Sequence, residues 1–254
     1  MISVVIVGTG NVAQNLYQAF EKSNDVTITQ VIGRNREHLT FVKNNIAIST
    51  TYNEIAAADI YILAISDDAI KLVAESFKDV DGIVAHTSGA TSLEALQSAK
   101  RPGIFYPLQT FTKGKIISFD DIPICVEATS EEDLHILKQL GKTLSNTVVE
   151  IDSEQRKTLH IAAVFVNNFT NYMYTIGSEI CNEHKIDFKL LQPLIKETAA
   201  KLDILTPLQS QTGPAKRGDQ KTLHNHLQII KDKHQRELYT LLSNAIKEKH
   251  GKEL

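Results

Sequence analysis

Short apolar runs recur through the first 151 residues, and stretches with helical spacing separate them. In the first such stretch, Val12, Leu16 and Phe20 recur every four residues, as one face of a helix requires. Apolar strands without polar alternation, separated by helices, are typical of a parallel sheet that is covered on both faces. We therefore expect an α/β fold with a doubly wound, mostly parallel sheet. The predicted strands span residues 3–7, 26–32, 46–48, 60–65, 83–86, 104–106, 122–126 and 148–151.

The pattern changes after Ile151, where the strand-like runs stop and helical spacing continues. Asp152 or Ser153 is expected to cap a helix that runs without proline to about His184. Residues 204–218 are rich in turn-forming residues, and the helices predicted around them span residues 188–202, 220–233 and 236–249. We predict two domains, residues 1–151 and an all-helical domain of residues 152–254, with the ligand site in the cleft between them.

Composition narrows the class of protein. The 254 residues carry 27 Lys and Arg against 30 Asp and Glu, a net charge of −3, which argues against a nucleic-acid partner. No apolar run reaches the ~18 residues that a membrane span needs, and the first residues lack the basic segment of a signal peptide. Cys125 and Cys181 are isolated, so we expect reduced thiols, a cytoplasmic protein and no metal site.

The strongest motif follows the first predicted strand. Gly8-Thr9-Gly10-Asn11-Val12-Ala13 reads G-x-G-x-x-A between that strand and an amphipathic helix, which is the context that a dinucleotide-binding loop requires. Gly8 permits the tight turn, Gly10 lets a pyrophosphate approach the backbone, and Ala13 allows close packing of helix and strand. We therefore expect a dinucleotide at the helix N-terminus, held there by free N–H groups.

The end of the second strand indicates which dinucleotide is bound. NAD-binding folds place Asp or Glu there on the ribose 2′-hydroxyl, but this chain reads Arg34-Asn35-Arg36. Guanidinium groups suit a 2′-phosphate, so NADP is favoured, although Arg36 alone also fits a solvated residue at a helix start. Ser66 ends the fourth strand, where it would contact the cofactor or cap the next helix.

Four motifs together resemble one family. They are the loop GTGNVA of residues 8–13, HTSGA of residues 86–90, FYPLQTF of residues 105–111 and TGPAKRGD of residues 212–219. The chain resembles, over nearly its whole length, a family of bacterial Rossmann-like NADP oxidoreductases of unassigned substrate with a C-terminal helical domain of unknown function. That family is related to 6-phosphogluconate dehydrogenase, ketopantoate reductase and pyrroline-5-carboxylate reductase. The resemblance implies a Rossmann domain, NADP and hydride transfer, but no particular substrate.

The ends of later strands carry the remaining candidates of the sheet domain. His86 and Ser88 follow the fifth strand, where nicotinamide and substrate are expected to meet, and a histidine there can move a proton near neutral pH. Tyr106 and Gln109 lie on another strand-end loop and offer a hydroxyl and an amide to a substrate. For His86 the alternative is a histidine that satisfies loop backbone, and for the other loop a rigid packing element.

In the related enzymes, the helix that opens the second domain carries a catalytic face. Its candidates here are His160 as proton donor, Asn167 or Asn168 to orient substrate, and Lys157, for which a solvated position is the favoured alternative. At 3–4 residue steps, Lys157, His160 and Asn168 would share a face. Pyrroline-5-carboxylate reductases have a Gly-rich loop that receives a carboxylate, and Arg217 occupies a comparable place, with a structural pair to Asp219 as the alternative.

The sequence therefore predicts an NADP-dependent oxidoreductase acting on a small carbonyl, imine or hydroxy compound. His160, His86 and Lys157 stay open as proton donors, and we expect a homodimer because the long helix leaves much apolar surface for a small domain to cover. The competing class is a non-catalytic protein that binds NADP as a sensor or binds a partner.

Overall fold

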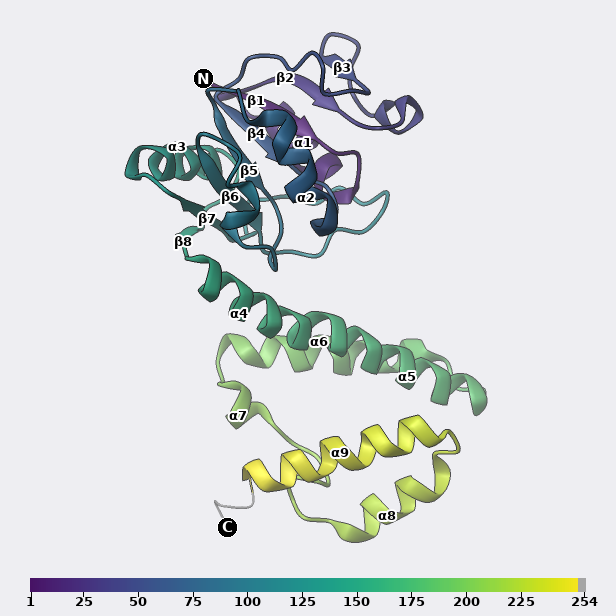
Figure 1. Cartoon of the computed structure of the whole chain (residues 1–254). Coiled ribbons are helices and arrows are strands. Elements are labelled where there is room, and N and C mark those ends of the chain that lie inside the picture. The colour runs from purple at the N-terminus through teal and green to yellow at the C-terminus, as the bar shows by residue number, and fades with distance from the viewer. Residues whose placement is uncertain (251–254) are drawn as a thin grey trace. The chain divides into compact units, whose positions relative to one another are not determined.

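The computed structural model describes residues 1–250, which fall into two compact units. The first unit, Met1–Ala163, contains an eight-stranded sheet, and the second unit begins at Val164 and is helical (Figure 1). The units meet along the chain at Ala163 and Val164, whereas the sequence suggested a domain boundary at residue 151. The sheet ends close to that predicted boundary, because its last strand finishes at Glu150.

The sheet has the strand order β3-β2-β1-β4-β5-β6-β7-β8. Neighbouring strands are parallel except β6 and β7, which are antiparallel. The connection of residues 108–123 between these two strands contains no crossover helix, which a parallel pair needs. The strands are β1 (Ile2–Val7), β2 (Val26–Ile32), β3 (Ala47–Ser49), β4 (Ile60–Leu63), β5 (Ile83–His86), β6 (Pro102–Pro107), β7 (Ile124–Ala128) and β8 (Val148–Glu150).

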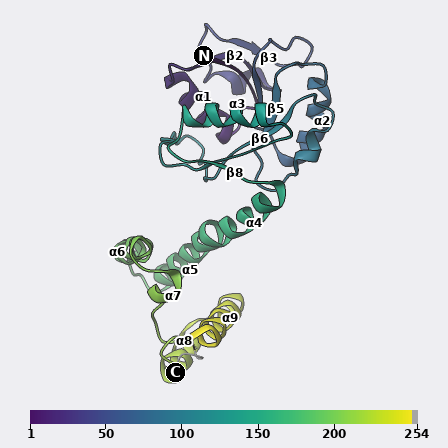
Figure 2. The ribbon, with the colours of Figure 1, turned by 90° about the vertical axis from the view of Figure 1, so that its left-hand side faces the viewer.

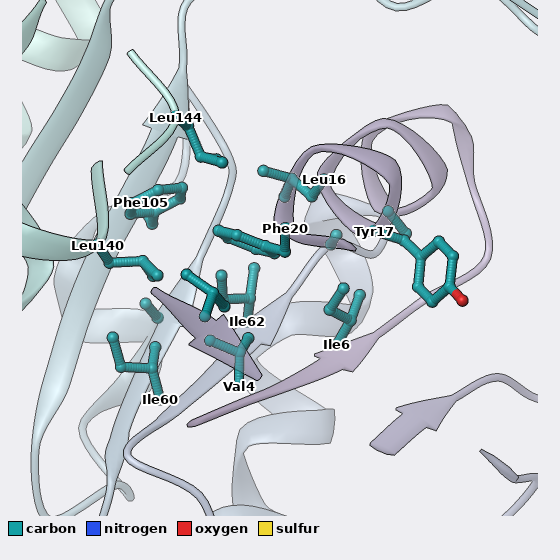
Figure 3. Packing of buried hydrophobic residues seen from close by; sticks show 14 of the residues in the cluster. Val4, Ile6, Leu16, Tyr17, Phe20, Ile60, Ile62, Phe105, Leu140 and Leu144 are labelled. Carbon is teal, nitrogen blue, oxygen red and sulfur yellow. The ribbon is translucent and has the colours of Figure 1, made fainter. Parts of the chain in front are cut away.

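Helices cover both faces of this sheet. Helices α1 (Asn11–Lys22) and α3 (Glu131–Lys142) pack on one face, and α2 (Asp67–Ala74) packs on the other (Figure 2). The larger apolar cluster joins α1 to the sheet, with Phe20 facing Val4 and Phe105 in its centre (Figure 3). Each such buried side chain stabilises the fold by about 1.5–3 kcal/mol. Shorter helical turns are η1 (Arg36–Leu39), η2 (Glu75–Phe77) and η3 (Leu93–Leu96).

Helix α4 (Ser153–Ala163) ends the first unit and has a defined start. The carboxylate of Asp152 accepts a hydrogen bond from the Gln155 N–H at 2.8 Å, and the Gln155 side chain accepts one from the Asp152 N–H at 3.0 Å. This reciprocal cap satisfies N–H groups that have no partner within a helix. Asp152 therefore caps the helix, and Ser153 is its first residue.

The second unit is helical over most of its described length. Residues 164–169 form a π-helix, in which the Thr170 hydroxyl reaches back five residues to the carbonyl oxygen of Phe165 at 3.3 Å. The elements of this unit are η4, the π-helix (Val164–Phe169), α5 (Thr170–Glu183), η5 (Phe188–Leu191), α6 (Gln192–Ala200), η6 (Lys201–Asp203), α7 (Pro207–Ser210), α8 (Gln220–Ile229) and α9 (Lys233–His250).

The structure confirms the predicted fold class, since each predicted apolar run overlaps a strand and the sheet is mostly parallel. Residues 204–218 contain the short helix α7, which was not predicted. A capping box explains it, because the Thr206 side chain accepts from the Gln209 N–H and the Gln209 side chain accepts from the Thr206 N–H.

Candidate functional site

The loop after β1 has the backbone geometry of a phosphate-binding turn. Gly8 has a φ of +125°, and a side chain there would overlap the carbonyl oxygen of Ala64 at the end of β4. Its N–H donates to the carbonyl oxygen of Ile32 in β2 at 2.8 Å. Only glycine adopts this conformation without strain, so Gly8 fixes the turn between three neighbouring strands.

Gly10 leaves the start of α1 open. It is exposed, an added Cβ would meet nothing within 4 Å, and no side chain caps the helix. The first N–H groups of a helix have no acceptor inside it, so those of Asn11 and Val12 point out of the α1 N-terminus. Free N–H groups and the positive end of the helix dipole suit a pyrophosphate. The residues present therefore fit the phosphates of a dinucleotide.

The side chain of Asn11 binds the backbone of the β6–β7 connection, whereas its own backbone N–H points out of the helix N-terminus. Its amide nitrogen donates to the carbonyl oxygen of Phe111 at 2.9 Å, and Asn15 one turn later holds the backbone of Lys115 and Ile117. Helix α1 thus fastens the β6–β7 connection. Thr9 lies against Gly33, because a Cβ added at Gly33 would lie 2.3 Å from the methyl carbon of Thr9.

The end of β2 presents two cations. Arg34 and Arg36 are both exposed, and neither forms an ion pair within residues 1–250. Asn35 between them caps η1, because its side-chain oxygen accepts from the Glu37 N–H at 2.9 Å. Burial raises the pKa of the Tyr52 hydroxyl and the charge of Arg34 opposes that rise, so Tyr52 lies near Arg34. No sequence motif had singled out Tyr52.

Ser66 stands at the N-cap position of α2 but its side chain makes no capping hydrogen bond. It is exposed just after β4, two residues beyond Ala64, whose carbonyl oxygen faces Gly8. Its position agrees with the capping interpretation, but its hydroxyl is not used to cap the helix. That hydroxyl is free to contact a ligand.

His86 is buried at the end of β5, with 0% of its surface exposed. Its Nδ1 accepts a hydrogen bond from the Ser88 N–H at 3.1 Å, and Nε2 faces the carbonyl oxygen of Ser92 at 3.4 Å. Burial, aided by the charge of Arg156, lowers the pKa of His86 to about 4. The ring is therefore neutral at pH 7, and both nitrogens hold the following loop.

Ser88 shapes the same loop. Its hydroxyl oxygen accepts from the N–H groups of Ala90 and Thr91 at 3.1 and 3.0 Å, and the residue is 7% exposed. Gly89 lies at the apex of this turn. An added Cβ there would stand 2.6 Å from Nδ1 of His160 and 2.8 Å from the Tyr106 ring. Only a glycine leaves room for those two side chains.

Tyr106 and His160 form a pair at this glycine. The Tyr106 hydroxyl lies 3.3 Å from Nδ1 of His160, and the two rings meet edge to face at 6.3 Å. Burial raises the pKa of the Tyr106 phenol, so it keeps its proton across the neutral range. The structure thus brings together two predicted residues that are 54 positions apart, one from β6 and one from α4.

The start of α4 is anchored to the sheet by Arg156, which sequence reasoning missed. Its guanidinium is 0% exposed, pairs with Glu127 of β7, and donates to the carbonyl oxygen of Thr91 at 2.6 Å. Ser153 joins the same group, because its hydroxyl contacts both Glu127 carboxylate oxygens at 2.9 Å. An arginine on an amphipathic helix is normally solvated, so no sequence signal marked it.

The other predicted residues lie apart from this pair or in the second unit. Lys157 is partly exposed on α4 and pairs with the exposed side chain of Glu154 at 2.7 Å. Gln109 is exposed and accepts a hydrogen bond from the neighbouring Thr110 N–H. Asn167 and Asn168 are exposed in the π-helix. Its wider turns differ from the α-helical spacing that was used to place Asn168 on one face with His160.

Arg217 is exposed in the turn before α8 and makes no ion pair with the described residues. Asp219 instead caps α8 by accepting from the Thr222 N–H at 3.0 Å. Within residues 1–250, no three His, Cys, Asp or Glu side chains come together as a metal site. None of the described helices has the length and apolar character needed to cross a membrane.

Two segments of the chain match models of known protein families. Residues 3–99 match the model for "NADP oxidoreductase coenzyme F420-dependent", and residues 122–246 match a "Domain of unknown function (DUF2520)". A search of curated proteins finds no match.

Solved structures extend this over the whole chain. A candidate NADP oxidoreductase from Bacteroides fragilis is 37% identical, with a TM-score of 0.87 over 97% of this chain and 98% of that one. A protein from Thermotoga maritima is 23% identical, with a TM-score of 0.76 over 98% and 99%. A reductive aminase from Aspergillus terreus in complex with NADPH shares the fold at 14% identity, with a TM-score of 0.71 over 99% and 96%. By its likeness to the Bacteroides protein, the chain belongs to the family of NADP oxidoreductases.

Proposed function

We propose that this NADP oxidoreductase reduces a small carbonyl or imine compound, or oxidises the corresponding hydroxy compound or amine, with His160 as the proton donor. The observation that carries the proposal is the Tyr106–His160 pair against Gly89. Tyr106 is the next-to-last residue of β6, and Gly89 lies in the loop after β5. The carboxyl ends of strands are where ligands of open α/β sheets bind.

The first unit offers a place for each part of NADP. The N–H groups at the start of α1 would hold the pyrophosphate, and Arg34 and Arg36 would hold the 2′-phosphate. Ser66 and Ser88 follow the ends of β4 and β5 and would contact the remainder of the cofactor. When bound, NADPH supplies a hydride.

The protein has to supply the proton that the substrate takes up when it is reduced. We assign His160 the tautomer with its proton on Nε2, in which Nδ1 accepts a hydrogen bond from the Tyr106 phenol. Nε2 is the nitrogen that the pair leaves free, so it can give its proton to an oxygen or nitrogen of the substrate while Nδ1 takes up the proton of the Tyr106 hydroxyl. The phenol then regains its proton from water. His86 is the weaker candidate because both of its nitrogens hold the loop of residues 88–92.

Exposed polar side chains supply candidate substrate contacts. We assign Gln109 of the first unit and Asn167, Asn168 and Arg217 of the second unit to this role, since their polar groups are exposed. Arg217 favours a substrate with a carboxylate, because a guanidinium binds that group through two hydrogen bonds. Residues 1–151 would then bind cofactor, and residues 152–254 would serve substrate binding and dimerisation.

A cytoplasmic homodimer completes the proposal. Large apolar side chains are exposed along η4 and α5, among them Phe165, Val166, Phe169 and Tyr172. An apolar surface of this kind is typical of a face that binds another protein surface. Cys125 and Cys181 are buried free thiols, as a reducing compartment allows.

The test is NADPH consumption with a panel of small ketones, aldehydes, imines and keto acids. His160→Ala should lower kcat by about 10²–10⁴-fold, the range for a lost general acid, while NADPH affinity stays unchanged. Lys157→Ala on the same helix is the matched variant and should keep its activity. Loss of activity in Lys157→Ala, with activity kept in His160→Ala, would identify Lys157 as the proton donor. Tight NADPH binding with no turnover of any panel member would favour a non-catalytic sensor.

A further inference from the structure

Arg156 is an unusual residue for the position it occupies. It is the largest side chain of the described chain that is fully buried, and its guanidinium carries a permanent charge. Its Nη atoms bind Glu127, the carbonyl oxygen of Thr91 and the hydroxyl of Ser153, whereas its Nε has no partner within the described residues. The charge is thus paired but the group is not fully satisfied.

Stability alone does not explain such a pair. Removing two charges from water costs several kcal/mol per ion, and well-packed apolar residues of similar volume often stabilise a fold equally well or better. An incompletely satisfied buried guanidinium costs still more. What the pair does provide is geometry, because a planar fork fixes the direction of each of its hydrogen bonds.

The geometry in question is that of the Tyr106–His160 pair. Arg156 lies one helical turn before His160 on α4, so the bonds that anchor its guanidinium hold the part of the helix that carries the imidazole. Through the Thr91 carbonyl it also holds the loop that contains Gly89, and through Glu127 it holds the strand next to β6. One side chain therefore connects the helix, the loop and the sheet that meet at the pair.

We propose that Arg156, with Glu127, is the positioning residue that sets the distance and orientation of His160 against Tyr106. This inference rests on the proposed role of His160 as proton donor and extends it to residues that do not touch the substrate. The charge of Arg156 also reaches the pair, because it opposes the rise that burial imposes on the pKa of Tyr106.

The test compares two arginine–carboxylate pairs of the same unit. Arg156→Lys keeps the positive charge but loses the fork, because one ammonium group cannot reproduce the directed bonds to Glu127 and Thr91. Arg101→Lys is the matched control, since Arg101 pairs with Asp133, which is 3% exposed, and lies away from His160. Glu127→Gln is a second variant that keeps the side-chain shape and removes the carboxylate charge from the pair.

The first measurement needs no substrate. The ring nitrogen signals of His160 are recorded by NMR with ¹⁵N-labelled histidine and assigned with His160→Ala. Arg156→Lys and Glu127→Gln should change these signals and their pH titration, and Arg101→Lys should leave them as in the unaltered protein. Unchanged His160 signals in folded Arg156→Lys or Glu127→Gln would overturn the proposal. This result is independent of whether the proposed reaction takes place.

The second measurement uses the NADPH consumption assay with the best panel substrate. A displaced acid should lower kcat by about 10²-fold in Arg156→Lys, with KM and NADPH affinity nearly unchanged. Arg101→Lys should keep kcat, whatever thermal stability it loses. Equal kcat in the two lysine variants would reduce Arg156 to a structural residue. If Arg156→Lys does not fold, the same comparison between Glu127→Gln and Arg101→Lys decides the question.

Discussion

The two units of this chain treat their apolar side chains differently. In Met1–Ala163 the sheet is covered on both faces, and Phe20 and Phe105 are fully buried in its clusters. Between Val164 and His250 none of the large apolar side chains is buried and many are exposed, including Phe165 and Phe169. No apolar core cluster of the described residues belongs to this part. A sheet between two helical layers completes its own core, whereas a few helices leave apolar faces that another surface must cover.

The largest expected effect tests this contrast with one substitution in each unit. Phe20→Ala removes a ring with 0% exposure and should lower the free energy of unfolding by about 3–5 kcal/mol. Phe169→Ala removes a ring with 49% exposure and should change the unfolding of the monomer by no more than about 0.5 kcal/mol. Denaturant unfolding at low protein concentration measures both.

The same pair of variants tests the homodimer. Phe169→Ala should shift the equilibrium toward monomer in a light-scattering concentration series, and Phe20→Ala should do so only through unfolding. Two results together would refute this contrast: a protein that is monomeric at micromolar concentration, and equal losses of stability in both variants. They would show that the second unit has a core of its own.

A second prediction concerns a polar group buried in the first unit. His86 has a pKa of about 4 when folded and 6.5 as a free side chain, so the unfolded chain binds the proton more readily. Its contribution to stability is complete above about pH 6.5 and is lost as the pH falls toward 4. The loss amounts to about 3 kcal/mol.

Unfolding free energies between pH 7 and pH 4 measure this effect, with His86→Gln as the variant that cannot take up the proton. His86→Gln should be less stable at pH 7 and should show a shallower fall with acid. Parallel curves for the two proteins would mean that His86 does not titrate as a buried neutral group, and that burial in the first unit is less complete than its apolar clusters indicate.

The sequence predicted the fold of the first unit well for a physical reason. Strands buried on both faces must be apolar throughout, so runs such as residues 60–65 and 83–86 stand out against helical spacing. The second unit was predicted less accurately, because the π-helix of Val164–Phe169 and the short helix Pro207–Ser210 depend on local hydrogen bonds rather than on apolar periodicity.

The site divides in the same way. The NADP-dependent oxidoreductase predicted from Gly8, Gly10 and Arg34 agrees with the family of the chain. The prediction was possible because a glycine motif between an apolar strand and a helix can be recognised from the sequence alone. That Tyr106 and His160 are neighbours could not be predicted, since their contact depends on how α4 leaves the sheet. Arg156 could not be predicted either, because nothing in a helical pattern marks an arginine as buried.

The smallest expected effect is on cofactor affinity, and it tests whether the two units bind different ligands. Arg34 belongs to the first unit and is proposed to bind the 2′-phosphate, whereas Arg217 belongs to the second and is proposed to bind substrate; both are exposed. Arg34→Ala should lower the ratio of NADPH to NADH affinity by about ten-fold, which is modest because water and salt screen an exposed charge.

Arg217→Ala should leave that ratio unchanged, and calorimetric or fluorescence titration with each dinucleotide measures both variants. Raising the ionic strength should reduce the preference of the unaltered protein for NADPH and leave Arg34→Ala nearly insensitive, because the screened interaction is the one already removed. Equal ratios in Arg34→Ala and the unaltered protein would assign the 2′-phosphate to other groups. A fall of the ratio in Arg217→Ala would place part of the cofactor site in the helical unit, and the division of tasks between the two units would then not hold.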